Sequence, residues 1–375
     1  MNIKIINKYN SKILLVIIIS LLIDNLFISN INIPPAWDQG YHLSNVFKMF
    51  NILVNSNLNI SNKIDQILNV TDTYRGPLTY LLSALFLTFT KNTYHFAYLS
   101  NQIFSIICIL TIYNLGKLFK DKSTGLWASI IFTFSSLIIN LRSDYLIDLS
   151  LTSFCSLNLL IFTKWFLEEK KVSLYSFFSG ISLGLIFLIK PTGIIFFFLP
   201  LITILIKFFK RENKFTFTLK QIILFIISFS IIIFPWFSRH WITIVSSSIN
   251  AWQWGVNYQE GLEFYSIESW LYYIKKLPLI LGIINFSILS TIFLIEKVNQ
   301  KELFKLRIKS TKIDLWFLIY FINCYLIGSI MSTKDIRFIL PLYPLVAIYL
   351  SSFINSNKYK LFNFYSKKNI LIISL

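Results

Sequence analysis

The stretch ILLVIIISLLIDNLFIS, residues Ile13–Ser29, decides the fold class. It is apolar apart from its serines and the pair Asp24-Asn25, and its length is close to the roughly 20 residues that a helix needs to cross a bilayer. Lysines precede it, but no small-residue cleavage site follows it, so it does not fit a cleaved signal peptide. We therefore expect a retained membrane-spanning helix.

Similar apolar runs recur along the chain, separated by short clusters of Lys and Arg. They cover Pro77–Thr90, Phe96–Gly116, Leu126–Leu141, Tyr145–Phe166, Leu174–Ile189, Gly193–Phe209, Leu219–Trp236, Tyr272–Ile295, Ile313–Met331 and Phe338–Ile354. A last apolar run starts at Ile370 and stops with the chain, so a longer parent sequence would continue it. The pattern predicts an all-α, polytopic helical membrane protein, formed as one module over residues 1–375 with no separate soluble domain.

The composition excludes other classes. Hydrophobic residues make up 55% of the chain and charged residues 14%, about half the charged share of soluble domains, so neither a soluble domain nor a disordered chain fits. The net charge is +18, and a strongly basic chain can be a nucleic-acid binder. Here, however, the basic residues lie between apolar runs and not on one solvated face. We therefore expect no nucleic-acid partner. The cysteines lie far apart inside apolar runs, which argues against a thiolate metal site.

The positions of Lys and Arg predict the orientation, because cytoplasmic loops are enriched in both. Most of the 35 such residues gather on one side if the N-terminus is cytoplasmic and Pro77–Thr90 does not cross the membrane. This predicts about ten full spans in the plasma (inner) membrane, with an eleventh starting at the C-terminal end. Residues 30–76 and 238–271 become large outer loops. Apolar residues recur at helical spacing between Leu43 and Val54, so the first loop should contain an interfacial helix.

Asp38 lies in PPAWDQGYH, residues Pro34–His42, just before this amphipathic segment. Asp is a favoured N-cap, so a purely structural role is one interpretation. A carboxylate at the boundary between water and an apolar layer can also serve as a general base. The two roles are compatible, because one oxygen can cap the helix while the other accepts a proton.

Two further groups of charged residues are expected at the outer face. Asp144 and Asp148 are four residues apart, on one face of the first turns of the helix predicted over Tyr145–Phe166, and Arg142 precedes them. They either complement the helix dipole and form a local ion pair, or bind an acceptor or a metal. Lys190 and Arg337 lie at the outer ends of apolar runs. They either extend towards lipid headgroups or clamp a phosphate.

Taken in order, these motifs resemble the GT-C membrane glycosyltransferases, in particular the group of protein O-mannosyltransferases and aminoarabinose lipid A transferases. The motifs are WDQGY from Trp37, YRGPLTY from Tyr74, Arg142-x-Asp144-x3-Asp148, KPTG from Lys190 and RFILP from Arg337. The resemblance covers nearly the whole chain. It implies a GT-C-like fold and transfer of a sugar from a polyprenyl-phosphate carrier to a lipid, glycan or protein acceptor on the periplasmic or outer face, with inversion.

The resemblance also implies roles for residues. Asp38 matches the acid of the first outer loop and would be the catalytic base, and Asp148 would be the second catalytic acid, orienting the acceptor or a metal. The expected substrate contacts are Asp144, Tyr41, His42, Arg75, Arg142, Lys190 and Arg337. The family pattern often reads Asp-Glu where this chain has Asp38-Gln39, so no metal ligands are assigned and a divalent metal stays open.

Three other functions stay open at this point. A transporter or lipid flippase would place ionisable residues near mid-bilayer on repeated, broken helices, whereas the acids here, apart from Asp24, gather at one face. A surface-polysaccharide polymerase or ligase would share the outward chemistry, but the acid directly after the first span argues against it. A non-enzymatic scaffold would not need the ordered acids.

Overall fold

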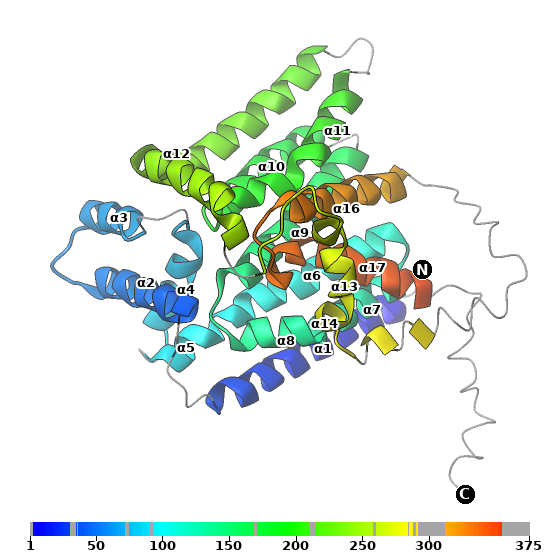
Figure 1. Cartoon of the computed structure of the whole chain (residues 1–375), viewed down its shortest axis with the longest axis horizontal. Coiled ribbons are helices and arrows are strands. Elements are labelled where there is room, and N and C mark those ends of the chain that lie inside the picture. Colours follow the sequence, from blue (N-terminus) through cyan, green and yellow to red (C-terminus); the bar gives the residue numbers. More distant parts are fainter. Residues whose placement is uncertain are drawn as a thin grey trace, which may run out of the picture.

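The computed structural model describes residues 3–30, 35, 37–71, 75–90, 93–168, 171–209, 215–257, 260–283, 285–287, 290–291 and 312–354. Helices joined by short loops make up this part of the chain, and no extended strand occurs within it (Figure 1). The predicted all-α class is therefore confirmed. Tyr74 of the predicted motifs, the run that starts at Ile370 and several basic clusters lie outside the described residues.

Long apolar helices account for half of the predicted spans. Within the described residues, five helices are long and apolar enough to cross a membrane. They lie at Ser11–Ser29 in α1 (Ile3–Ser29), Tyr94–Phe119 (α5, Tyr94–Leu99, with α6, Asn101–Phe119), Ile147–Leu167 (α9), Leu219–Ala251 in α12 (Phe215–Gln253) and Lys312–Ile330 (α16). Each overlaps a run predicted from the sequence, and the chain is an integral membrane protein.

The run Leu126–Leu141, expected to be one span, is broken. It forms α7 (Lys122–Thr133) and α8 (Ser136–Ser143), which meet at 60°. The break follows from Ser135, whose backbone is extended and whose hydroxyl donates to the carbonyl oxygen of Phe132 at 3.0 Å. A serine side chain that bonds a nearby carbonyl offers the backbone an alternative to the regular helix.

Shorter apolar helices form the other runs. They are α4 (Leu78–Thr88), α10 (Val172–Phe187), η1 (Pro191–Phe197) continued by α11 (Phe198–Phe209), and η3 (Ile336–Leu342) continued by α17 (Tyr343–Ile354). With 11 residues, α4 extends over about 16 Å, roughly half the hydrocarbon core. That length agrees with the prediction of a helix that does not cross the membrane.

The predicted outer loop 238–271 is helical over its first half. Helix α12 has 39 residues and continues through Pro235 to Gln253. A proline inside a helix removes one hydrogen bond and bends the axis, and Figure 1 shows that α12 changes direction along its length. Apolar residues continue beyond the bend, so the helix does not end there.

The predicted span Tyr272–Ile295 is also not one continuous helix. Its start belongs to α13 (Ile267–Lys275), followed by α14 (Leu277–Leu281). Helix α14 stops at Gly282, which has a φ of 81°. Glycine adopts this left-handed conformation at little cost and commonly ends helices.

The predicted first outer loop, residues 30–76, contains α2 (Trp37–Val54) and α3 (Ile60–Asn69). The apolar face of α2 is buried, with Leu43, Val46 and Met49 inside, and this face packs on α4. Figure 1 places α2, α3, α4 and α5 together at one side of the molecule, with α9 in its middle. Helix α2 includes the segment predicted to be amphipathic, Leu43–Val54, and its apolar face is covered by protein.

Candidate active site

Asp38 and Arg75 form the first contact of the site. Asp38 lies in the first turn of α2, one residue inside the helix and not at the cap position. Its Oδ1 accepts a hydrogen bond from Nη2 of Arg75 at 3.1 Å. The guanidinium also lies 5.2 Å from the centre of the Tyr41 ring. Burial raises the pKa of Asp38, but the charge and hydrogen bond of Arg75 outweigh it, so the pKa lies below the ordinary value of 3.8.

The backbone next to Arg75 is fixed against the loop that ends in Lys190. The amide of Gly76 donates to the carbonyl oxygen of Ile189 at 3.0 Å, and the amide of Leu78 donates to that of Leu188 at 3.0 Å. A Cβ on Gly76 would come within 2.1 Å of the Leu188 oxygen. Only glycine permits this approach, which brings the predicted phosphate contacts Arg75 and Lys190 to the same part of the fold.

Arg337 enters the same region from η3. Its Nη1 lies 3.8 Å from Oδ2 of Asp148. Asp335 holds the guanidinium, because its Oδ2 accepts from Nε at 2.9 Å and from Nη2 at 2.6 Å. Lys190 lies 4.8 Å from the ring centre of Phe338, the residue after Arg337. The prediction missed Asp335, although the spacing Asp335-x-Arg337 is a local signal for such a pair.

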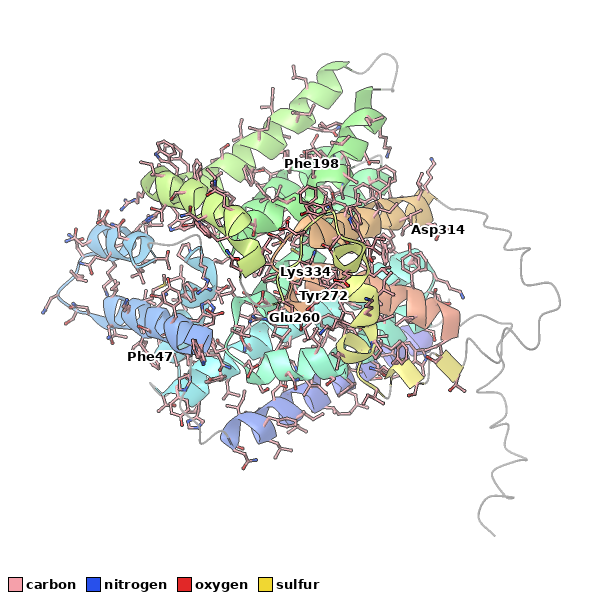
Figure 2. All side chains as sticks on the ribbon, in the orientation of Figure 1. Phe47, Phe198, Glu260, Tyr272, Asp314 and Lys334 are labelled. Carbon is pink, nitrogen blue, oxygen red and sulfur yellow. The ribbon has the colours of Figure 1, made fainter. Side chains whose placement is uncertain are left out.

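A buried lysine anchors the segment that carries Asp335 and Arg337. Lys334 is 1% exposed, and its Nζ donates to the carbonyl oxygens of Gly328 at 2.9 Å and Ser329 at 2.7 Å. Figure 2 shows Lys334 in the middle of the molecule. It satisfies carbonyl groups at the C-terminal end of α16, as cations often do there. Lys334 therefore ties the start of η3 to α16.

Asp148 and Asp144 do not share a helix face, which corrects the prediction. Asp148 is buried in the first turn of α9 (Ile147–Leu167). Asp144 lies before that helix, as the extended C-cap of α8. Burial raises the pKa of Asp144, and a hydrogen bond from Gln39 opposes the increase. Gln39 also accepts from Tyr98 Oη at 2.6 Å, so Asp144 contacts the residue beside Asp38.

His42 is buried on α2 and bonded to α4. Its Nδ1 lies 2.7 Å from Tyr80 Oη, and the two rings stack at 5.6 Å. Burial and the positive charge of Arg75 lower the pKa of His42 to about 3, and the charges of Lys190 and Arg337 act in the same direction. His42 is therefore neutral at physiological pH. Its pKa is lowered by cations that also surround Asp38.

Arg142 does not join this group. Its side chain is 1% exposed and pairs with Asp24 of α1, with Nε 2.8 Å from Oδ1. Its Nη1 donates to Ser20 Oγ and to the Thr133 carbonyl oxygen. The prediction of Arg142 as an outward substrate contact is wrong, because its guanidinium is buried against Asp24. The sequence alone does not show that α1 lies beside α8.

The structure thus gathers carboxylates and cations from segments far apart in the sequence: Asp38, Arg75, Asp148, Lys190, Asp335 and Arg337. The charge of Arg337 lowers the pKa of Asp38, as expected for groups that face one another. Such a group can hold a phosphate on its cations and accept a proton on a carboxylate. Among the described residues, no set of three or more His, Cys, Asp or Glu side chains lies close enough to hold a metal ion.

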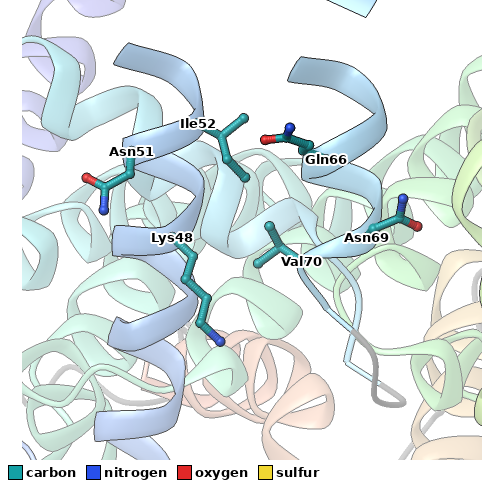
Figure 3. A pocket seen from close by; sticks show the side chains of 6 residues that line it. All are labelled: Lys48, Asn51, Ile52, Gln66, Asn69 and Val70. Carbon is teal, nitrogen blue, oxygen red and sulfur yellow. The ribbon is translucent and has the colours of Figure 1, made fainter. Parts of the chain in front are cut away.

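A separate groove lies between α2 and α3, with a volume of about 490 Å³. Figure 3 shows side chains from both helices facing it. Its lining residues are Lys48, Asn51, Ile52, Gln66, Asn69 and Val70. None of them is a predicted site residue, so the groove is distinct from the charged group around Asp38.

Comparisons with known proteins agree with this fold. Residues 73–375 match the model of the Alg9-like mannosyltransferase family. No curated protein sequence matches the chain. The crystal structure of ArnT from Cupriavidus metallidurans bound to undecaprenyl phosphate is similar, with a TM-score of 0.65 and 12% identity over 92% of this chain and 60% of that one.

A second similar structure is the archaeal oligosaccharyltransferase AglB from Archaeoglobus fulgidus, in complex with an inhibitory peptide and a dolichol-phosphate. Its TM-score is 0.52 and its identity 14%, over 96% of this chain and 52% of that one. At these identities the likeness shows the fold, and the expected GT-C-like architecture is confirmed. This chain spans 60% of the ArnT chain and 52% of the AglB chain.

Proposed function

This chain belongs to the Alg9-like mannosyltransferase family, and from that premise we propose that it moves a sugar from a polyprenyl-phosphate carrier to an acceptor on the non-cytoplasmic face of the membrane. The observation that carries the proposal is the pairing of Asp38 with Arg75 at 3.1 Å. It places a candidate base directly beside a candidate phosphate ligand. The similar structures contain undecaprenyl phosphate and dolichol-phosphate, which supports a lipid-phosphate donor.

The donor phosphate would bind to Arg75, Lys190 and Arg337. Arginine matches the geometry of phosphate oxygens, and lysine adds a point charge. The sugar–oxygen bond to the phosphate breaks in the reaction, and negative charge builds up on the departing phosphate. Fixed cations lower the barrier because they stabilise this charge without having to reorganise.

Asp38 would take the proton of the acceptor. The acceptor oxygen or nitrogen attacks the anomeric carbon, its proton passes to the Asp38 carboxylate, and the phosphate leaves from the opposite side, which inverts the configuration. While Arg75 is bound to Asp38, the carboxylate is a weak base, since its pKa is low. A donor phosphate that attracts Arg75 would raise this pKa and so strengthen the base.

The remaining site residues would bind and orient the substrates. Asp148 contacts Arg337 at 3.8 Å and would orient the acceptor. Asp144 reaches the same region through Gln39. Tyr41 and neutral His42 lie on the face of α2 that carries Asp38 and are candidates for sugar contacts. A lipid, a glycan or a protein are the acceptor classes.

The decisive experiment is transfer from defined polyprenyl-phosphate sugars by purified protein in lipid nanodiscs. We expect product with at least one donor, and a decrease of about 10²–10⁴-fold for Asp38→Asn, as is typical when a general base is removed. Asp148→Asn is the second variant, and binding of the unglycosylated lipid phosphate is the control for a folded site. Full activity of folded Asp38→Asn would exclude Asp38 as the base. Movement of the lipid across the membrane without transfer would favour the transporter.

The orientation is tested by labelling single cysteines in intact cells. The native cysteines Cys108, Cys155 and Cys324 are buried, so they give little background. We expect Trp37→Cys, at a position 95% exposed, to react with an impermeant reagent from outside. Lys120→Cys should react with the same reagent only after the membrane is permeabilised. Labelling of Lys120→Cys from outside would overturn the proposed cytoplasmic N-terminus and outward-facing site.

A further inference from the structure

A buried ion pair joins the first span to the broken helix α7–α8. Arg142 Nε lies 2.8 Å from Asp24 Oδ1, and the two side chains are 1% and 4% exposed. Removing two charges from water costs several kcal/mol for each ion, and apolar residues at such a position are often as stable. Charged residues inside spans are rare and usually serve a function. The pair therefore calls for a role other than stability.

Arg142 connects three helices. Its Nη1 donates to Ser20 Oγ on α1 at 2.8 Å and to the carbonyl oxygen of Thr133 at 2.9 Å. Thr133 is the last residue of α7, and Arg142 lies near the end of α8. One guanidinium thus spans the 60° break between α7 and α8 and attaches both halves to α1.

The segment that follows Arg142 is also held by Asn101, the first residue of α6. Asn101 Nδ2 lies 3.4 Å from the carbonyl oxygen of Arg142 and 2.8 Å from that of Asp144. This connector, residues 143–146, leads directly into α9. The first turn of α9 carries Asp148, which lies 3.8 Å from Arg337. A shift of the connector would therefore move Asp148 relative to Arg337.

We propose that Asp24, Arg142 and Asn101 are positioning residues that fix the connector 143–146 and so hold Asp148 against Arg337. The inference rests on the proposed function, because it assigns a catalytic consequence to that placement. Arg75 and Lys190 are joined through the Gly76 and Leu78 backbone hydrogen bonds to the 188–189 carbonyls, not through the connector. Loss of the ion pair should therefore reduce turnover and leave the affinity for the donor phosphate unchanged.

The test uses the double variant Asp24→Leu/Arg142→Met. Removing one partner alone leaves a buried charge and destabilises the protein strongly, whereas replacing both with apolar residues is often neutral or stabilising. We expect a melting temperature equal to or above that of the wild type. We expect kcat to decrease by about 10–100-fold, the size of effect that a displacement of about 1 Å produces, while the KM for the donor stays the same.

The matched control is the exposed pair of Arg239 and Asp65, whose Nη1 and Oδ1 lie 2.5 Å apart between α12 and α3. Asp65→Asn/Arg239→Gln removes an ion pair that has no path to the connector, and it should keep the wild-type kcat. Asn101→Leu is the second test variant, needed if the first double variant does not fold. It removes the hydrogen bonds to the connector and should give the same separation of kcat from KM.

Each outcome decides between specific alternatives. A wild-type kcat in stable Asp24→Leu/Arg142→Met would mean that the ion pair only supports the fold, and the inference would be wrong. An equal change in the donor KM would also overturn it.

If the wild type transfers no sugar from any donor, the proposed function fails, and hydrogen exchange then tests the positioning alone. The amide of Asp144 is bonded to the carbonyl oxygen of Asn140, and that of Leu146 to the carbonyl oxygen of Asp144. Both amides should exchange faster in Asp24→Leu/Arg142→Met than in the wild type, and unchanged exchange would refute the positioning role.

Discussion

Nη2 of Arg75 lies 3.1 Å from Oδ1 of Asp38, although 36 residues, with most of α2 and all of α3, separate them in the chain. The arginine is the less exposed of the two, 18% against 49%, and its guanidinium also covers the Tyr41 ring. A carboxylate with this partner is held in its ionised form. The pair therefore links the charge state of the candidate base to the residue that would receive the donor phosphate.

The first prediction concerns the pH dependence of the Arg75→Gln variant. Burial raises the pKa of Asp38, and Arg75 is the largest of the groups that lower it, so loss of Arg75 should raise the pKa. The base is active when ionised, and its activity is lost as the pH falls through its pKa. We expect the acidic limb of kcat/KM, which reports the free enzyme, to move to higher pH in the variant. An unchanged limb with a reduced rate would mean that Asp38 does not act as the base.

The second prediction concerns Gly76→Ala. Its Cβ would lie 2.1 Å from the Leu188 carbonyl oxygen, so the backbone must move and the Gly76–Ile189 hydrogen bond must lengthen or break. We expect a loss of about 1–3 kcal/mol in stability from this overpacking and a higher donor KM, since Arg75 moves away from Lys190. Thermal unfolding and kinetics in nanodiscs measure the two effects. Thr88→Ala, at the exposed end of α4, the helix that follows Gly76, is the control and should change neither.

Much of the fold could be predicted because apolar length alone specifies a span. Ile13–Ser29 and Tyr145–Phe166 correspond to helices within a few residues. The break after Thr133 could not be predicted, since it depends on whether Ser135 bonds a local carbonyl or continues the helix. The continuation of α12 beyond Pro235 has a similar cause, because a proline can bend a helix without ending it.

The site residues that could be predicted from the sequence are those that lie in recognisable motifs. The structure brings Asp38, Arg75, Lys190 and Arg337 together from separate motifs. Arg142 was misplaced because the charge pattern does not show which acid it meets, and its partner Asp24 lies more than a hundred residues away. Arg142 pairs with Asp24 because both side chains are buried, and this burial results from the packing of α1, α7 and α8.

The third prediction concerns Asp335, which holds Arg337 by two side-chain hydrogen bonds and also accepts from its backbone amide. Asp335→Asn has one acceptor oxygen and no negative charge, so it cannot accept from the backbone amide of Arg337 and from its guanidinium at the same time. We expect the donor KM to rise by about tenfold, the effect of losing one charged hydrogen bond. Arg337→Lys should show a similar rise, because lysine cannot make the paired contact. A donor KM unchanged in both variants would remove Arg337 from the phosphate site.

The last prediction concerns the stability contributed by His42. Its pKa is lowered to about 3 in the folded protein by burial and by Arg75, whereas the unfolded chain has the ordinary value of 6.5. Below pH 6.5 the unfolded state binds a proton that the folded state does not, so stability decreases as the pH falls from 6.5 towards 3. The loss amounts to about 2 kcal/mol at pH 5, from the free energy of one pKa unit.

The measurement compares melting temperatures at pH 7 and pH 5 for the wild type and for His42→Gln. Glutamine has no proton to gain in this range, so we expect its melting temperature to decrease less than that of the wild type. Tyr80→Phe serves as the companion variant. It removes the 2.7 Å contact to Nδ1 and should lower stability by about 1–3 kcal/mol, the cost of an unsatisfied buried polar group. Because His42 is neutral throughout, the rate of His42→Gln should depend on pH near 6.5 as the wild-type rate does, and loss of a titration there would contradict the assignment.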